Sequence, residues 1–351
     1  MTIQEYYDML PKNTDAYYSN KRISQSQLKT LLFNPKLFLE EEQPELYFEE
    51  KKHFVIGGAV DTLLTQPETF NDKYYVSSVE KKPSDTVKSI IHQVYDNAPK
   101  EDLENSTEFE DYTVEILQSC IEHDYCPTFK NGTRVNKVLE FKDYWNELID
   151  SKGKTILSLE ESDIVTKVVK DINSSPLAKY FKPNEAPKGV DILLQQPILF
   201  EIDDIGCKAL LDIVVIDHNN KTIIPIDLKT MSGNIIDFPK SVKLRRYDLQ
   251  AAWYTEALKQ MCKSIAIADY KIENFCFIVA STTEDQPPVM FQCTNKLLEE
   301  GKHGREEVVI EGIKFNRVKG YLDLISDYEW YVENGFHQHR DLCGNIVKLE
   351  I

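Results

Sequence analysis

The segment from residue 191 to 230 constrains the fold more than any other part of the sequence. Three runs rich in apolar and β-branched residues, 192–202, 207–216 and 222–229, are separated by Asp203-Asp204-Ile205-Gly206 and His218-Asn219-Asn220-Lys221. Apolar runs of this length, interrupted by Asp, Asn and Gly, are typical of β-hairpins. The sequence therefore predicts three consecutive antiparallel strands.

The second predicted hairpin brings acidic residues together. If its turn is centred on Asn219-Asn220, paired residues have numbers that sum to 439, and Asp212 faces Asp227. Opposed side chains have Cβ atoms about 4.5–5.5 Å apart, and two like charges there repel unless a cation lies between them. Lys229 lies two residues from Asp227 and shares its face. The pattern favours phosphodiester hydrolysis with one or two Mg²⁺ or Mn²⁺ ions, in which Lys229 positions the attacking water or stabilises the phosphorane charge. The alternative is a salt-bridged group on an exposed sheet face.

A helix predicted over residues 247–262 adds further polar groups. Gln250 and Tyr254 are four residues apart and share a face, and Arg246 is expected one turn earlier on that face. Amide, phenol and guanidinium groups can bind phosphate oxygens. A basic cluster stands out in this acidic chain: Lys240, Lys243, Arg245 and Arg246. The alternative is an ordinary amphipathic helix with a solvated polar side.

The remaining periodicity predicts an α/β fold with a mixed central β-sheet flanked by helices. Helices are expected from Ser24 to Asn34, over 54–65, over 158–181 with a Ser158 and Glu161 capping box, and over 321–334; a strand is expected over 275–281. We expect three parts: 1–77, an N-terminal helical part of the core; 78–155, an acidic and mostly helical insertion; and 156–351, the core with the hairpin and the polar helix.

Composition bounds the class of protein. The chain has 351 residues and a formal net charge of -17, so any nucleic-acid partner must meet a local basic surface. Seven cysteines without a closely spaced pair favour a reducing compartment. The N-terminal sequence has no apolar signal segment, and no long apolar run is present. These features predict a cytoplasmic protein without membrane contact.

The ordered series of motifs resembles a known nuclease family. Asp212, then Ile-Asp227-Leu-Lys229-Thr, then Gln250-x-x-x-Tyr254 resembles the PD-(D/E)XK (restriction-endonuclease-like) nucleases related to exodeoxyribonuclease VIII (RecE) and, more distantly, to phage lambda exonuclease. Residues 23–35 and 57–70 resemble the family's N-terminal segments, and about two-thirds of the chain is covered.

The resemblance implies a site and an activity. Asp212 and Asp227 would be metal ligands with the Leu228 carbonyl, Lys229 would be the catalytic lysine, and Gln250 and Tyr254 would complete the site. Family members digest linear duplex DNA, usually 5′ to 3′, for recombination or DNA processing. Many are phage-encoded oligomers that supply a single strand to an annealing protein. The alternatives are a structure-specific or restriction-type endonuclease on the same core, and a DNA-binding or assembly protein with a decayed site.

Two positions depart from the family pattern. Asp61 stands where many relatives have a histidine, and we expect it to be an oxygen ligand rather than only a helix residue. If the first hairpin pairs residues whose numbers sum to 409, Glu201 faces Lys208, and the acid that relatives carry on this strand falls near Gln195 or Gln196. The sequence thus predicts an amide there and a weakened second metal site.

Two further predictions concern ligands. Ser24 and Ser26, beside Arg22, begin a helix whose N-terminus can hold a 5′-phosphate, although helix capping explains the same residues. Some relatives bind an iron–sulfur cluster through closely spaced cysteines, but Cys276, Cys293 and Cys343 are too far apart in sequence, so no cluster is expected.

Overall fold

The protein is described by a computed structural model that covers residues 5, 17–39, 48–79, 81–100, 103, 108–265, 267–306, 308–310, 313–315, 317–337 and 340. The chain divides into two compact units: unit 1, Met1–Thr65 with Val165–Ile351, and unit 2, Gln66–Ile164. The predicted part boundaries after residues 77 and 155 both lie inside unit 2. Cys343 lies outside the described residues.

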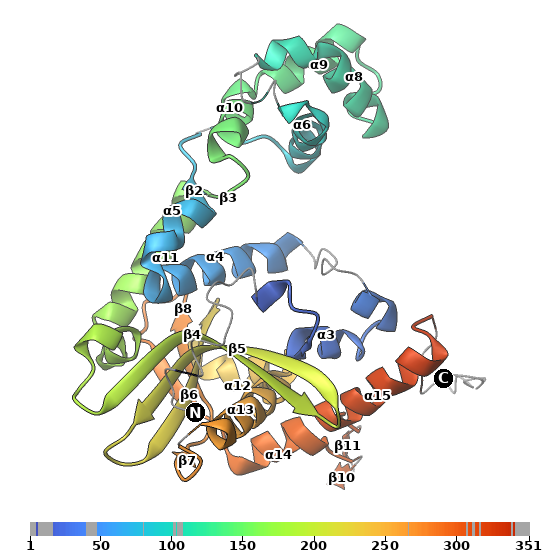
Figure 1. Cartoon of the computed structure of the whole chain (residues 1–351). Helices are drawn as coiled ribbons and strands as arrows, with labels where there is room; N and C mark the ends of the chain where they lie inside the picture. The colour runs from blue at the N-terminus through green and yellow to red at the C-terminus, as the bar shows by residue number, and fades with distance from the viewer. Residues whose placement is uncertain are drawn as a thin grey trace. The chain divides into compact units, whose positions relative to one another are not determined.

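Unit 2 is mostly helical (Figure 1). It has a hydrophobic core of its own. Trp145 is fully buried there, and its ring stacks on Phe109 with centroids 4.7 Å apart. A short parallel pair of strands, β2 and β3, accompanies the helices. The elements are η2 (Pro67–Thr69), α5 (Phe70–Lys73), β2 (Tyr74–Val76), α6 (Asp85–Asn97), η3 (Phe109–Tyr112), α8 (Thr113–Glu122), α9 (Asn131–Leu139), α10 (Lys142–Ser151), β3 (Thr155–Leu157) and the start of α11 (Leu159–Asn173).

Unit 1 is built on a mixed β-sheet. Within the described residues the sheet has seven strands: β1 (Ile23–Ser24), β4 (Val190–Ile202), β5 (Ile205–Asp217), β6 (Thr222–Met231), β7 (Lys271–Ile272), β8 (Cys276–Ser281) and β9 (Val289–Gln292). β5 is antiparallel to β4 and β6, whereas β6 is parallel to β7 and β8. A mixed sheet flanked by helices confirms the predicted α/β class.

The register of the β5–β6 hairpin is the predicted one. Ile213 pairs with Ile226 and Asp217 with Thr222, so paired numbers sum to 439. His218 to Lys221 form the connecting turn. Asp212 and Asp227 come directly after the last pair, Ile213 and Ile226, and in this register their numbers also sum to 439.

The predicted register of the β4–β5 hairpin is wrong by two residues. Ile202 pairs with Ile205, so only Asp203 and Asp204 form the turn. Their φ angles are 48° and 65°, the left-handed values of a two-residue type I′ turn, which Asp tolerates. The four-residue turn assumed from the sequence placed every partner two positions too far along the strand.

The corrected register changes the partner of Glu201. Leu199, not Glu201, pairs with Lys208, whereas Glu201 pairs with Gly206. The Glu201 carboxylate instead lies 3.4 Å from the Arg22 guanidinium.

The helices of unit 1 follow the predicted start signals more closely than the predicted ends. Ser24 caps α3 (Gln25–Thr30) in a capping box with Gln27, and Ser158 and Glu161 form the predicted box at the start of α11. α11 ends at Asn173 and not at residue 181, because Ser175 and Pro176 begin the separate 3-10 turn η4 (Pro176–Phe181). The other elements are η1 (Pro35–Leu39), α4 (Phe48–Thr65), η5 (Pro183–Glu185), η6 (Ile235–Asp237), α12 (Phe238–Leu244), α13 (Tyr247–Ser264), α14 (Asn295–His303), β10 (Val308–Ile310), β11 (Ile313–Phe315) and α15 (Tyr321–Asn334).

Two helices fix the surroundings of the β5–β6 hairpin (Figure 1). α13 packs against β4 and β5, and its buried Trp253 donates from Nε1 to the Lys208 carbonyl at 3.1 Å. α4 packs against β6, where a Cβ on Gly57 would lie only 3.1 Å from Thr230 Oγ1, so glycine permits the close approach. In the part of the chain that the structure describes, no helix is both long and apolar enough to cross a membrane.

Candidate active site

A cavity of about 830 Å³ lies in unit 1, where α3, α4, α12 and α13 meet strands β4, β5 and β6. It brings together most of the predicted site. Its lining includes Asp61, Asp212, Asp227, Lys229, Gln250 and Tyr254. Leu228, Ser24, Ser26, Gln195 and Arg245 belong to the same wall.

The two strand aspartates are held by different donors. Asp227 is 2% exposed, and its Oδ1 accepts a hydrogen bond from Gln250 Nε2 at 2.7 Å. Lys229 Nζ lies 2.5 Å from Asp227 Oδ2, yet this buried oxygen receives no hydrogen bond of regular geometry, so the contact is an ion pair. Asp212 Oδ2 accepts from the Leu228 N–H at 2.8 Å, which ties its strand to β6 beside Asp227.

Burial, together with two neighbouring carboxylates, disfavours the ionised form of Asp212. Burial raises the pKa of Asp212 well above its usual value, and the charges of Asp227 and Asp61 raise it further. Lys229 and the Leu228 N–H lower the pKa but do not cancel the rise. The ionised form of Asp212 is therefore destabilised unless a further cation binds beside it.

Lys229 stays charged despite its surroundings. Burial lowers the pKa of Lys229, but the charges of Asp227, Tyr247 and Asp212 outweigh burial and raise it above the usual value. Its Nζ also lies 4.9 Å from the centroid of the Tyr247 ring, a cation–π distance. Burial and the nearby Asp227 raise the pKa of Tyr254 well above its usual value, so its hydroxyl remains protonated and can donate. At physiological pH, Lys229 is thus a cation and Tyr254 a neutral donor.

Asp61 lines the cavity beside Gln195, which binds its carboxylate. The Gln195 amide donates to both Asp61 oxygens, at 3.0 and 2.9 Å. Gln195 has φ +50° and interrupts the pairing of β4 with β5 between Leu194 and Gln196. Gln196, in contrast, is buried, and its amide donates to the Pro197 carbonyl. Of the two predicted amides, Gln195 lines the cavity and Gln196 does not.

Few acidic side chains in the described part of the chain lie close enough together to bind a metal ion. Among the described residues, no three or more His, Cys, Asp or Glu side chains form a group that could hold a metal ion by themselves. A metal here would therefore depend on Asp212 and Asp227, with backbone carbonyls and water completing its shell.

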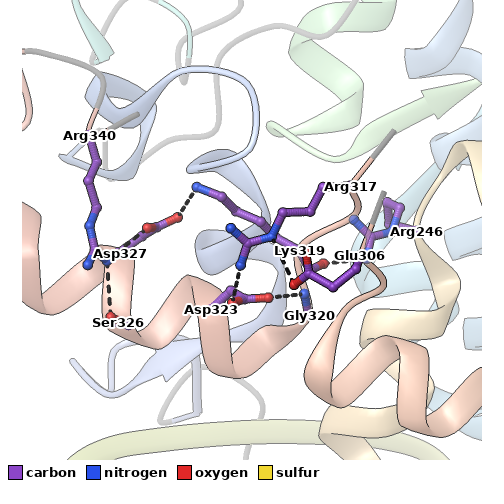
Figure 2. A network of polar contacts seen from close by, with 9 residues as sticks. All are labelled: Arg246, Glu306, Arg317, Lys319, Gly320, Asp323, Ser326, Asp327 and Arg340. Atoms are coloured by element: carbon purple, nitrogen blue, oxygen red, sulfur yellow. Dashed lines mark hydrogen bonds and ion pairs between the residues drawn. The ribbon is translucent and has the colours of Figure 1, made fainter. Parts of the chain in front are cut away.

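Arg246 does not share the face of Gln250 and Tyr254, contrary to the prediction. α13 begins at Tyr247, as predicted, so Arg246 lies just outside the helix, with φ +55°. Its guanidinium donates to Asp248 and to the Lys319 carbonyl (Figure 2). Helical spacing predicts which residues share a face only within the helix, and Arg246 lies outside α13.

The other predicted DNA-binding residues divide between the cavity and the surface. Arg245, Ser24 and Ser26 line the cavity. Lys243 is exposed on α12 outside the lining, and Arg22 donates to the Phe200 carbonyl at 2.7 Å. Ser24 Oγ accepts from the Gln27 N–H at 3.3 Å, so the capping role of Ser24 is confirmed.

Two further cavity residues, Lys208 and Tyr247, could have been found from their spacing to the predicted site residues. Lys208 lies four residues before Asp212 on β5, hence on the same strand face, and Tyr247 lies three residues before Gln250 on α13. Lys208 is buried, and its Nζ donates to the carbonyls of Tyr17, Tyr18 and Asn20 at 3.1, 3.3 and 2.7 Å. Lys208 therefore holds the chain before β1 against the cavity.

Comparisons with known proteins give a limited result. No protein-family model matches the sequence, and no curated protein sequence matches it. One similar solved structure is that of a candidate exonuclease from Eubacterium rectale, with a TM-score of 0.45 and 13% identity over 100% of this chain and 96% of that chain. At that score and identity, the likeness carries no conclusion about the activity of this chain.

Proposed function

We propose that this chain is a metal-dependent DNA nuclease of the PD-(D/E)XK kind that hydrolyses phosphodiester bonds. One observation carries the proposal: Asp212 and Asp227 lie on neighbouring antiparallel strands in one cavity, and Lys229 contacts Asp227 at 2.5 Å. This combination of two carboxylates and an ammonium group is the one that the sequence motif predicts. A salt-bridged group on an open sheet face is a poor alternative, because Asp227 is almost fully buried.

The residues of the cavity fit a bound Mg²⁺ or Mn²⁺ ion. Asp227 Oδ2 is a buried acceptor without a regular hydrogen bond. Burial and the charges of Asp227 and Asp61 raise the pKa of Asp212, and a bound cation would favour its ionised form. Carboxylate and carbonyl oxygens are the donors that these ions prefer. Asp212, Asp227 and the Leu228 carbonyl would hold the ion. The predicted ligand role of Asp61 is not part of the proposal, because both of its oxygens accept from Gln195 and no three acidic side chains among the described residues form a metal-binding group. A bound ion lowers the pKa of an attacking water and neutralises charge on the phosphate.

The protein groups around this site have separable roles in the proposal. Lys229, kept charged by Asp227, binds a phosphate oxygen and orients the nucleophilic water. Gln250 fixes the orientation of the Asp227 carboxylate through Oδ1. Tyr254 stays protonated and donates to the substrate. Lys208 and Lys29 add positive charge to the cavity wall, which favours a polyanion locally.

The preferred substrate is linear duplex DNA, digested from its ends and in the 5′ to 3′ direction. End-labelled linear DNA with Mg²⁺ tests the activity and its direction. Wild type should release labelled nucleotides, Lys229→Ala should be at least about 100-fold slower, and Lys221→Ala, an exposed lysine of the same hairpin, should match wild type. Equal rates for Lys229→Ala and wild type would reject the role of Lys229.

Two alternatives are separated by simple controls. A covalently closed circular duplex should survive incubation with the protein and Mg²⁺; its cleavage would favour an endonuclease. The amide at Gln195 favours a second candidate, a DNA-binding or assembly protein with a decayed site, because relatives carry an acid near this position. Calorimetry with Mn²⁺ decides between an active nuclease and a decayed site. Binding that is lost in Asp227→Ala supports the nuclease, and no binding by wild type supports the decayed site.

A further inference from the structure

Arg246 occupies a position that the proposed nuclease function does not use. It immediately precedes α13, has a left-handed backbone with φ +55°, and is absent from the cavity lining. Its side chain is 14% exposed. Nε and Nη2 donate to the Asp248 carboxylate, each at 3.0 Å, and Nη2 donates to the Lys319 carbonyl at 2.6 Å. One guanidinium thus joins the first turn of α13 to the chain just before α15.

The Lys319 end of this contact is itself anchored (Figure 2). Lys319 Nζ lies 2.8 Å from Asp327 Oδ2, and Arg340 Nη1 lies 3.0 Å from Asp327 Oδ1. The next residue, Gly320, donates its N–H to Asp323 Oδ2 at 2.9 Å. Asp327 is 5% exposed, so these ion pairs are little screened by solvent. The carbonyl that receives Arg246 is therefore fixed to α15.

The α13 end leads to the cavity. Tyr247, the residue after Arg246, carries the ring that faces Lys229, and Gln250 lies one turn further and donates to Asp227. A shift of this turn would move both contacts together. Small displacements of groups that orient reacting residues lower rates strongly.

We propose that Arg246 is a positioning residue that clamps the first turn of α13 to the segment before α15, and thereby sets the positions of Tyr247 and Gln250. Its effect on cleavage rests on the proposed nuclease function, whereas its effect on α13 does not. Lysine keeps the charge but lacks the planar fork that reaches Asp248 and the Lys319 carbonyl at once. The clamp is thus specific to arginine.

Hydrogen exchange on the full chain tests the clamp directly. The amides of residues 251–254 bond to the carbonyls of the first turn of α13, so their exchange should become roughly tenfold faster or more in Arg246→Lys. Amides 259–264 should change much less, which separates a local effect from global destabilisation. Arg246→Gly should give the same result, because glycine keeps the left-handed backbone without the side chain. Unchanged exchange at 251–254, or equal acceleration in the matched control Arg245→Lys, would overturn the clamp.

Cleavage and DNA binding test how Arg246 acts. In Arg246→Lys the single-turnover rate at saturating DNA should fall roughly tenfold, with the DNA dissociation constant and its salt dependence unchanged. A salt slope smaller by about one in Arg246→Gly would make Arg246 a phosphate contact and overturn the positioning role. If wild type does not cleave DNA, the nuclease proposal fails, and the exchange result still decides the clamp.

Discussion

Replacing Asp212 by asparagine should stabilise the metal-free protein at neutral pH and abolish its affinity for divalent cations. The asparagine Oδ1 can still accept from the Leu228 N–H, which bonds to Asp212 at 2.8 Å in the wild type. The substitution removes one negative charge from a wall that also contains Asp227 and Asp61. Those two charges, with burial, raise the pKa of Asp212.

The size of the effect follows from the hairpin geometry. Opposed cross-strand residues have Cβ atoms about 4.5–5.5 Å apart, and two unit charges at about 5.5 Å repel by roughly 3 kcal/mol at an effective dielectric constant of about 20. Attraction from Lys229 offsets part of this repulsion, which leaves roughly 1–2 kcal/mol, or about 2–8 °C in the melting temperature.

The pH dependence has a definite sign. Because the folded pKa of Asp212 is above its unfolded value, the native state binds this proton more tightly than the unfolded state does. The contribution of Asp212 to stability is present at low pH and is lost as the pH rises through its folded pKa. The advantage of Asp212→Asn over wild type should therefore grow from acidic to neutral pH.

Thermal unfolding in EDTA between pH 5 and pH 8 measures this difference. Asp285→Asn, at an exposed acid of the β8–β9 connection, is the matched control and should show no such trend. Saturating Mn²⁺ should raise the melting temperature of wild type, by the equivalent of about 2.7 kcal/mol at 100 times the dissociation constant, but not that of Asp212→Asn. A variant less stable than wild type in EDTA at pH 8, or one that responds equally to Mn²⁺, would refute the reasoning.

Three other substitutions probe the surroundings of the site. Lys208→Met should leave buried carbonyls without their donor and lower the free energy of unfolding by roughly 2–4 kcal/mol. Proteolysis of the chain before β1 should become faster, which measures the effect. Gly301→Ala should destabilise unit 1 by roughly 1–3 kcal/mol or more, measured by thermal unfolding, because its Cβ would lie only 2.1 Å from the Asp248 carbonyl oxygen. Gln195→Glu should replace an amide donor to Asp61 by a negative charge and therefore lower the stability of the protein in EDTA. The same change should increase the affinity for Mn²⁺, measured by calorimetry. An unchanged affinity would argue against a role of this cavity wall in metal binding.

The fold class could be predicted because it depends on long, simple patterns. The hairpin strands are apolar runs between polar turns, and the helix from Tyr247 and the closing helix Tyr321–Asn334 have helical spacing of apolar residues. The β5–β6 register was predictable as well, because Asn219-Asn220 marks the centre of its turn. The aspartate pair and Lys229 follow from that register alone.

The errors arise where one local detail controls many positions. Asp203 and Asp204 both adopt left-handed backbone angles, and the resulting two-residue turn moved Glu201 away from Lys208. The sequence does not reveal whether a polar stretch forms a two-residue or a four-residue turn. Similarly, α13 begins at Tyr247 as predicted, but Arg246 lies just before it with a left-handed backbone, and its side chain bonds to Lys319. Helical spacing does not give the direction of a side chain outside the helix, even where the predicted boundary is right.

The overall charge of the chain says little about the proposed DNA partner. More than half of the net charge of -17 belongs to unit 2, whereas the cavity belongs to unit 1. The cavity wall has four lysine or arginine side chains, Lys29, Lys208, Lys229 and Arg245, against three carboxylates. Charges are screened beyond about 8 Å at physiological salt, so a phosphate in the cavity would respond mainly to this local set. A divalent ion on Asp212 and Asp227 would add two further positive charges, so the cavity of an acidic chain could attract a polyanion.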